Sequence, residues 1–280
     1  MSITQQEKSA RFRALHERPG AFVIPNPWDI ASARILAGMG FEALATSSAA
    51  SAVAVGRKDG GLTREQALAH ARMIVEATDL PVSADLENGF GDAPQVVAET
   101  VRLASSVGLV GCTIEDSTGN PDHPLYDFNL ALERVAAAAE AAQTLPFVLT
   151  VRTHNLLFAN PSLDETIRRL QAFEQAGADV LFAPGLPDLN SVRTVCSSLT
   201  KPFNFMVGFK GKSFSVPELT AAGVKRISLA TSLYRAAMTG FVEAVMEVKN
   251  SGQFLFLDRS MTTQDLLTLM QIGSAPPAAR

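Results

Sequence analysis

The fold of this 280-residue chain is indicated by four related segments: GMGFEAL (residues 38–44), SVGLVGC (106–112), QAGADVL (175–181) and AAGVKRI (221–227). In each segment a helical pattern ends at a glycine, and an apolar strand pattern begins directly after it. Glycine is favoured at a helix end because the left-handed backbone conformation costs it little. The four segments therefore predict the same helix-to-strand junction, repeated along the chain.

A second type of junction places a proline at a strand entrance, in TDLPVSADL (78–86), QTLPFVLTV (143–151) and LTKPFNFMV (199–207). Proline lacks the N–H that a central ladder position needs, so the start of a strand suits it. The two junction types largely alternate along the chain. This alternation predicts a repeated unit of strand and helix.

Eight short apolar runs have the length and composition of strands buried on both faces: 22–25, 43–47, 82–86, 111–116, 148–153, 180–183, 203–207 and 226–230. Helical patterns separate them, for example at 31–39, 63–77, 93–107 and 163–176. Eight such units in about 250 residues predict a closed (β/α)8 TIM barrel, an α/β fold. An open doubly wound sheet is disfavoured because no glycine-rich dinucleotide turn follows the first strand.

We expect one barrel domain over residues 1–252, which includes an N-terminal helical segment, and a C-terminal tail over 253–280. The tail begins with the apolar residues FLFL and contains a short helical pattern at 262–270 with a Thr-Thr-Gln-Asp start. An apolar tail beyond the eighth strand favours packing between subunits.

Composition excludes several other classes of protein. The chain is 47% hydrophobic and 19% charged, with a net charge of −4 and no basic footprint for nucleic acid. It has neither a membrane-spanning apolar stretch of about 20 residues nor the apolar core of a signal peptide at its polar start. Cys112 and Cys196 are too few for a disulfide framework. We expect a soluble, cytoplasmic protein that binds neither nucleic acid nor membrane.

Carboxylates crowd the predicted ends of the third and fourth strands. Asp85 and Glu87 are two residues apart, and Glu115 with Asp116 ends the neighbouring strand about 5 Å away. Chemistry in this fold lies at the carboxyl ends of the strands, and carboxylates gathered there repel unless a cation lies among them. Oxygen ligands alone favour Mg²⁺, with Mn²⁺ as an alternative. The competing interpretation is that these acids cap helices or pair with arginines inside the barrel.

Two further strand ends carry groups that suit an anionic substrate. Arg152 ends the fifth strand, where its guanidinium can hold a carboxylate with two hydrogen bonds or form a structural salt bridge. Ser47 and the small residues after it, in ATSSAASA, follow the second strand. Their backbone N–H groups can approach a developing oxyanion closely. The alternative for this stretch is a tight connection without chemistry.

These motifs resemble those of the isocitrate lyase/phosphoenolpyruvate mutase superfamily over about residues 22–246. The resemblance rests on ATSSAASAVAVGRKD (45–59), SADLENGFGD (83–92), GCTIEDS (111–117), VRTHN (151–155) and AAGVKRISLATSLYRAA (221–237). It implies a (β/α)8 barrel whose eighth helix is exchanged between the partners of a dimer, often within a dimer of dimers, so the resemblance leads us to expect a homodimer or homotetramer. It also implies a 2-oxo acid substrate, or a 2-hydroxy acid that yields one.

The resemblance assigns roles to individual residues. Asp85 would bind Mg²⁺ directly, with Glu87 and Glu115 helping partly through water. Ser47, with the backbone N–H groups of Ser48 and Ala49, matches an oxyanion-binding turn. Three more positions are substrate-binding candidates: Arg152, which matches the arginine that holds the substrate, Asp59, which matches an acid near the site, and Trp28, which walls the pocket or packs at the barrel rim.

Departures from the superfamily pattern narrow the activity. The loop after the fourth strand, STGNPDHPLYD (117–127), lacks the Lys-Lys-Cys-Gly-His element whose cysteine is the acid in isocitrate and methylisocitrate lyases. It also lacks a recognisable match to the Lys and Asn of the phosphonopyruvate mutases. His123 on this loop is a candidate for proton transfer, and exposure to solvent is its alternative. The role of His154, which stands where relatives carry an acid, is left open.

The sequence thus predicts a Mg²⁺-dependent carbon–carbon lyase that acts on a 2-oxo or 2-hydroxy dicarboxylate through an enolate. Decarboxylation of oxaloacetate is favoured because it needs no cysteine acid. The alternatives are a 2-methylisocitrate-type lyase, a phosphonopyruvate-type hydrolase or mutase, and a barrel that binds a 2-oxo acid without turning it over.

Overall fold

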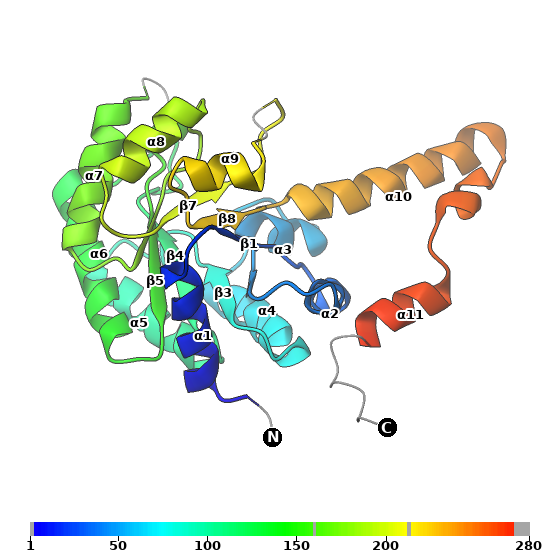
Figure 1. Ribbon diagram of the computed structural model, residues 1–280, viewed down its shortest axis with the longest axis horizontal. Coiled ribbons are helices and arrows are strands. Elements are labelled where there is room, and N and C mark those ends of the chain that lie inside the picture. The colour runs from blue at the N-terminus through cyan, green and yellow to red at the C-terminus, as the bar shows by residue number, and fades with distance from the viewer. Residues whose placement is uncertain (1–2, 159–160, 212–213, 272–280) are drawn as a thin grey trace.

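A computed structural model describes residues 3–158, 161–211 and 214–271 of the chain (Figure 1). Its eight parallel strands are β1 (Phe22–Ile24), β2 (Leu44–Ala45), β3 (Val82–Asp85), β4 (Gly111–Glu115), β5 (Val148–Arg152), β6 (Val180–Phe182), β7 (Phe203–Met206) and β8 (Arg226–Ser228). They are paired in the order β1-β8-β7-β6-β5-β4-β3-β2. A hydrogen bond from Ala45 N to Pro25 O, 3.0 Å long, brings β2 back to the chain beyond β1. The predicted (β/α)8 barrel is confirmed.

The helices of the described chain are α1 (Gln5–Glu17), α2 (Ile30–Gly38), α3 (Ser48–Ala54), α4 (Arg64–Ala77), α5 (Pro94–Ser106), α6 (Phe128–Gln143), α7 (Leu163–Gln175), α8 (Leu189–Ser197), α9 (Val216–Ala221), α10 (Ser232–Ser251) and α11 (Thr263–Gln271), and those from α2 to α9 lie between successive strands. The four helices predicted from their periodicity begin and end within one residue of the expected bounds. Side-chain caps fix the starts of α2, α4 and α7, for example Thr63, which accepts from the N–H of Gln66, whereas α5 begins with Pro94 and has no side-chain cap. None of the described helices is long and apolar enough to cross a bilayer.

The N-terminal end of the barrel is closed by α1. Phe12 and Leu15 of this helix are buried in one apolar cluster with Phe22, Val148 and Val180, which begin β1, β5 and β6. The opposite end, where the strands finish, carries the loops. Polar residues beyond the strands are therefore gathered at a single open mouth, as the barrel architecture requires.

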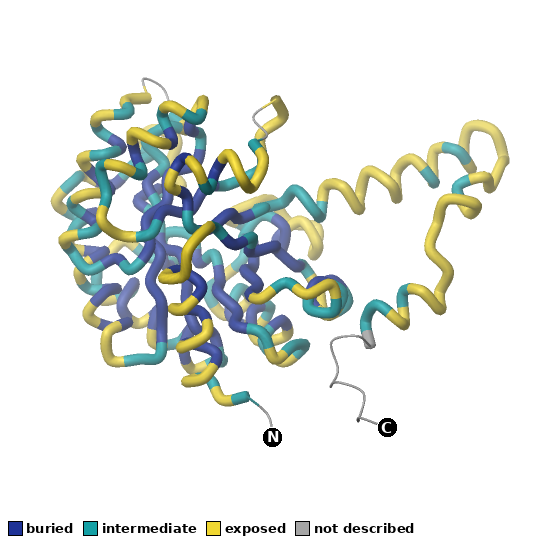
Figure 2. The backbone as a smooth tube through the Cα atoms, in the orientation of Figure 1, coloured by how far each residue is buried: buried dark blue, intermediate teal, exposed yellow. Residues whose placement is uncertain are grey.

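The eighth barrel helix, α10, does not fold back onto the strands (Figure 1). It projects away from the barrel, and none of its residues is buried (Figure 2). A short 3₁₀ helix, η2 (Leu255–Arg259), turns the chain, and α11 returns to contact α2. Thr262 caps α11 through Asp265, as the Thr-Thr-Gln-Asp pattern predicts. Exchange of α10 between subunits stays a prediction, and residues 272–280 lie outside the described residues.

His16 of α1 is buried beneath the barrel. Its ring meets Phe12 and Phe22 edge to face, at centroid distances of 4.8 and 4.9 Å. Its Nδ1 lies 2.8 Å from the Phe12 carbonyl oxygen, and its Nε2 is buried with no hydrogen-bond partner among the described residues. Burial therefore lowers the pKa of His16 from 6.5 to about 3.

A His16→Phe variant should resist acid better than the native protein. Because the pKa of His16 is lower in the folded state, its contribution to stability is present above pH 6.5 and is lost as the pH falls toward 3. Between pH 7.5 and 4 the native protein should lose about 3 kcal/mol of unfolding free energy through His16. Urea unfolding at both pH values measures it. The exposed His123→Phe change is the control, and equal acid losses in all three proteins would contradict the prediction.

Candidate active site

Three charged side chains meet where β3, β4 and β5 end. Arg152 lies between two acids: its Nη1 is 3.9 Å from Oδ2 of Asp85, and its Nε is 3.5 Å from Oε2 of Glu115. All three side chains are at most 18% exposed. Glu115 and Arg152 are direct partners in the parallel ladder between β4 and β5. Strand register therefore brings these predicted site residues together.

An inner cavity of about 40 Å³ opens beside this cluster, within the barrel mouth. Its walls come from the ends of most of the strands and include Asn26, Ala45, Thr46, Ser47, Asp85, Thr113, Arg152, Phe182, Met206, Arg226, Ser228 and Ala230. The space exceeds the roughly 10–15 Å³ that one water molecule requires. The inner cavity can thus hold a small polar group.

An outer cavity of about 360 Å³ lies on the loop side of the same acids, and Glu87 and Glu115 both line it. Glu87 follows β3 in the left-handed backbone region, with φ of 52°. Its carbonyl oxygen accepts from the N–H of Glu115 at 2.9 Å, and its own N–H donates to Oδ1 of Asp85 at 3.3 Å. A non-glycine residue in this region is strained, which is typical of functional loops.

Burial and mutual repulsion act on the carboxyl groups. Burial, followed by the charges of Asp85, Asp59 and Glu115, raises the pKa of Glu87 to about 7. Burial also raises the pKa of Asp85, against the opposing effect of Arg152. Burial acts on Glu115 in the same direction, but Arg152 and His154 outweigh it and hold the pKa of Glu115 below its usual value. The cluster therefore has more negative charge than its single arginine balances.

The carboxylate cluster offers the type of ligand atom that a hard divalent cation prefers. Asp85, Glu87 and Glu115 offer only oxygen atoms, and burial, followed by the charges of the neighbouring acids, raises the pKa of Glu87. Among the described residues, no three acidic, histidine or cysteine side chains gather tightly enough to surround one ion. Arg152 occupies the place between Asp85 and Glu115. The metal roles of these acids stay predictions.

The small-residue stretch after β2 forms a helix rather than a loop. Ser47 caps α3, and its side chain accepts from the N–H of Ala50. The Oγ of Ser48 donates to Oδ2 of Asp85 at 3.0 Å, and the Ser48 N–H points to the same oxygen at 3.4 Å. Ser47 lines the inner cavity, so the start of α3 faces the carboxylate cluster.

Arg134 of α6 anchors the loop that carries Glu87. Its buried guanidinium donates to the carbonyl oxygens of Asn88, Gly91 and Asp92, and it stacks on the ring of Tyr126 with 4.0 Å from Cζ to the centroid. The Tyr126 hydroxyl in turn donates to Oδ1 of Asp92 at 2.6 Å. These bonds hold the loop in the turn where Glu87 has its positive φ.

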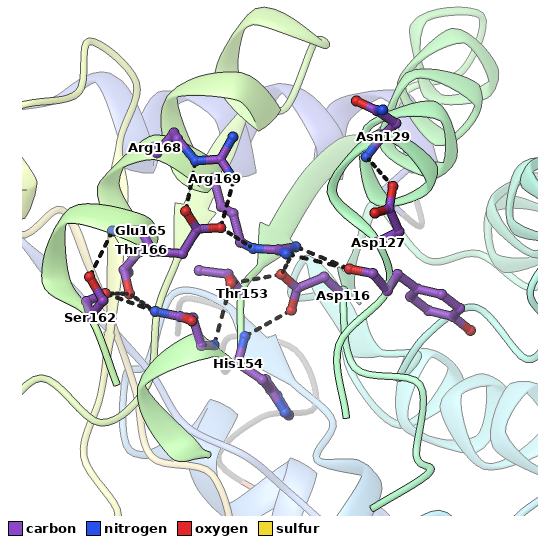
Figure 3. Close-up of polar contacts among 12 residues, drawn as sticks. Asp116, Asp127, Asn129, Thr153, His154, Ser162, Glu165, Thr166, Arg168 and Arg169 are labelled. Atoms are coloured by element: carbon purple, nitrogen blue, oxygen red, sulfur yellow. Dashed lines mark hydrogen bonds and ion pairs between the residues drawn. The ribbon is translucent and has the colours of Figure 1, made fainter. Parts of the chain in front are cut away.

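Asp116 faces away from the mouth, although it adjoins Glu115. Successive strand residues point to opposite faces, so only one of the two can reach the site. Oδ2 of Asp116 accepts from Thr153 Oγ1 at 2.7 Å and from Arg169 Nη1 at 3.2 Å, and Oδ1 accepts from the His154 N–H at 2.9 Å (Figure 3). Asp116 is 3% exposed. It fixes the chain that leaves β5.

His154 is held next to the carboxylates by this network. Its Nε2 lies 2.9 Å from Oε2 of Glu115. The centroid of its ring lies 6.1 Å from that of Phe158. His154 therefore contacts a predicted metal ligand, where the superfamily resemblance had left its role open. It helps to hold Glu115 in its ionised form.

Three predicted residues lie farther from the inner cavity. Asp59 is exposed but lines the outer cavity opposite Glu87. Trp28 packs edge to face against Tyr234 of α10, with 5.4 Å between the ring centroids. His123 is exposed on the hairpin closed by the Ser117–Leu125 bridge, and it does not appear among the linings of either cavity. A catalytic role of His123 stays a prediction.

Arg226 is a cavity residue that the sequence analysis missed. It begins β8, whereas site residues in this fold are expected at the ends of strands. It is 2% exposed and lines the inner cavity together with Asp85 and Arg152. The available signal was an arginine inside an otherwise apolar strand pattern, since a buried charge needs a partner or a ligand.

Comparisons with known proteins agree with this architecture. The family model of phosphoenolpyruvate phosphomutase matches residues 12–249. A Burkholderia cenocepacia J2315 crystal structure, provisionally called a lyase/mutase, is 47% identical, with a TM-score of 0.93 and 97% of each chain covered. The crystal structure of 2,3-dimethylmalate lyase is 30% identical, with a TM-score of 0.85 and coverage of 96% of this chain and 95% of that one. The Probable 2-methylisocitrate lyase 2 of Corynebacterium glutamicum is 27% identical over 96% of this chain and 90% of its own.

Fold and site thus define a (β/α)8-barrel enzyme with a carboxylate–arginine cluster at the barrel mouth. The chain belongs to the phosphoenolpyruvate phosphomutase family, within the isocitrate lyase/phosphoenolpyruvate mutase superfamily. The superfamily resemblance inferred from the motifs is confirmed. The predicted class of enzyme, a carbon–carbon lyase, is likewise confirmed by its relatives.

The two adjacent arginines of α7 should differ strongly in their effect on stability. Both pair with Glu165, but Arg169 also pairs with buried Asp116 and its side chain is 9% exposed, against 53% for Arg168. Arg169→Ala leaves the buried Asp116 without its cation, so the change should cost about 3–5 kcal/mol of unfolding free energy. Arg168→Ala should cost at most about 1 kcal/mol. Urea unfolding compares the pair, and similar costs would show that Asp116 does not depend on Arg169.

Proposed function

We propose that the protein is a Mg²⁺-dependent carbon–carbon lyase that acts on a small 2-oxo or 2-hydroxy dicarboxylate through an enolate, with oxaloacetate as the favoured substrate. The observation that carries this proposal is the bridging of Asp85 and Glu115 by Arg152 beside a cavity at the barrel mouth. The choice of oxaloacetate is supported by one relative of this chain, the oxaloacetate decarboxylase of Ectopseudomonas mendocina, which is 27% identical over 89% of this chain.

Oxygen atoms of Asp85, Glu87 and Glu115 would hold the ion. When bound, Mg²⁺ or Mn²⁺ would supply a Lewis acid that draws electrons toward the substrate's carbonyl oxygen. Arg152 can turn its planar guanidinium from the acids to a substrate carboxylate or oxyanion, which it matches with two hydrogen bonds. Ser47 and the start of α3 add donors at the same wall of the cavity.

Decarboxylation of oxaloacetate then needs little further machinery. The bond between C3 and the C4 carboxylate breaks, CO₂ leaves, and the electron pair moves into the enolate of pyruvate. Positive potential from Arg152 and the donors of α3 favours the enolate oxygen as its charge develops. Protonation at C3 completes pyruvate. The inner cavity, about 40 Å³ in volume, can take one polar group of such a compact substrate.

Cleavage of a substituted dicarboxylate is the second candidate. It is favoured by the similarity to 2-methylisocitrate lyase and to 2,3-dimethylmalate lyase over nearly the whole chain. The loop over 117–127 opposes it, since this loop carries neither a cysteine nor a lysine to protonate the leaving fragment. A phosphonopyruvate-type reaction and binding without turnover are the remaining outcomes of the substrate panel below.

Asp85→Asn should reduce product formation at least about a thousandfold, because the change keeps the shape of the side chain and removes its charge. The assay incubates the protein with Mg²⁺ and oxaloacetate, 2-methylisocitrate, 2,3-dimethylmalate or phosphonopyruvate, and separates the products by liquid chromatography. Protein-free Mg²⁺ samples correct for spontaneous decarboxylation. Asp164→Asn, on an exposed turn of α7, is the control. Unchanged turnover in Asp85→Asn would refute the assigned role.

The same proposal includes a homo-oligomer built through α10. Five apolar residues of this helix are between 37% and 61% exposed: Phe241, Val242, Val245, Met246 and Val248. Helix α10 follows Ala230, whose φ of 48° turns the chain away from the barrel. An apolar face of this length on a monomer marks an interaction site, and a second copy of the chain is the partner that the superfamily resemblance implies.

Light scattering after size exclusion should give the native protein two or four times the chain mass of 29.8 kDa. A Phe241→Glu/Val245→Glu double variant should shift toward a smaller assembly, since it places charges in the apolar face. Glu243→Gln on the same helix should leave the mass unchanged. A monomeric native protein would contradict the oligomer proposal.

A further inference from the structure

Arg226 is a buried cation whose hydrogen bonds are incomplete. Its Nη1 reaches across the barrel from β8 and donates to Thr150 Oγ1 of β5 at 2.9 Å. Its Nε is buried and has no partner among the described residues. A guanidinium carries five N–H donors, and leaving such donors unpaired in the interior is costly. The position therefore has unused capacity to bind an acceptor.

Arg226 is one of the residues that line the inner cavity. Thr150 lies two residues before Arg152 on β5, so Arg226 is bonded to the layer of side chains directly beneath Arg152. No ion pair within 4.0 Å joins Arg226 to Asp85 or to another acid of the described chain. The cavity thus separates an unpaired buried cation from the charged cluster at the mouth.

The two cavities differ in charge. The inner cavity is lined by two arginines, Arg152 and Arg226, and one acid, Asp85. The outer cavity is lined by one lysine, Lys58, and three acids, Asp59, Glu87 and Glu115. Burial lowers the pKa of Arg226 to about 10, which still leaves it charged near neutral pH. The inner cavity therefore favours an anion, and the outer cavity favours a cation.

From this geometry we infer that Arg226 forms an anion subsite at the inner end of the cavity, where it binds one carboxylate of the substrate. The inference rests on the proposed function and extends it, because it assigns the second acid group of a dicarboxylate to a named residue. The cavity volume of about 40 Å³ exceeds the roughly 10–15 Å³ that one water molecule requires, so the cavity has room for one small group. Arg226 thereby favours a ligand with two carboxylates over a ligand of similar size with one.

The test compares oxalate with pyruvate, which replaces one carboxylate of the probe by an acetyl group. Isothermal titration in MgCl₂ measures both dissociation constants for the native protein, Arg226→Met and Lys225→Met. Arg226→Met should weaken oxalate about 10- to 100-fold, the range of a charge-assisted hydrogen bond, and pyruvate by less than about threefold. Lys225→Met removes the same charge from the preceding residue, whose Nζ bonds to the Arg18 carbonyl outside the cavity, and should change neither constant.

A second variant guards against loss of the fold. Arg226→Lys keeps the charge and should retain more oxalate affinity than Arg226→Met, and thermal unfolding identifies any variant that is not folded. Equal weakening of oxalate and pyruvate, no weakening at all, or failure of the native protein to bind oxalate would each overturn the subsite.

Failure of the subsite can be told from failure of the proposed function. Oxalate binding that depends on Arg226 in a protein without turnover would support the subsite and refute the lyase. Turnover with oxalate binding that is indifferent to Arg226 would support the lyase and overturn the subsite.

Discussion

The site depends on the compensation of charges that the barrel forces together. Parallel strands end at one rim, so Asp85 and Glu115 are brought to the same place by backbone hydrogen bonding rather than by mutual attraction. Arg152, from the next strand, lies within 3.9 Å of one acid and 3.5 Å of the other. Without a cation between them, two buried carboxylates at this separation would raise each other's pKa or push the strand ends apart.

The neighbouring structure holds this cluster in place from two sides. On one side, Asp116 ties together Thr153, Arg169 and the backbone of His154, and so fixes the exit of β5 just after Arg152. On the other side, Arg134 fixes the turn that follows β3. Each support includes a buried arginine, Arg169 on one side and Arg134 on the other, which donates to a carboxylate or to carbonyl oxygens. A barrel mouth made of loops thereby gains the rigidity that precise chemistry needs.

Much of this arrangement could be predicted from the sequence, because it follows from short-range patterns. Glycine and proline junctions mark the strands, and the strand ends mark Asp85, Glu115 and Arg152. Alternation along β4 would also have placed Asp116 on the outer face, had it been applied. The alternative interpretation, in which the acids pair with an arginine inside the barrel, describes what the structure contains. The metal role of the same acids stays a prediction.

Other features depend on contacts that no local pattern encodes. Arg134 binds carbonyl groups 42 to 46 residues earlier in the chain, and Arg226 reaches a hydroxyl 76 residues away. Neither partner is identifiable before the barrel closes. The positive φ of Glu87 is equally invisible, since the residue type gives no sign of it. The small residues after β2 were mistaken for a loop because alanine and serine fit a helix start as well as a turn.

The opposite charges of the two cavities would allow one short stretch of barrel to bind the proposed ligands of both signs. A cluster of acids alone would repel a dicarboxylate, and a cluster of arginines alone would repel a divalent cation. Here the acids line the loop side, the arginines line the inner side, and Asp85 with Arg152 stands at the boundary. Each bound charge would therefore lower the electrostatic cost of holding the other. Binding of the cation and binding of the anion should be coupled, because each bound ion supplies the counter-charge that the residues lining its cavity lack.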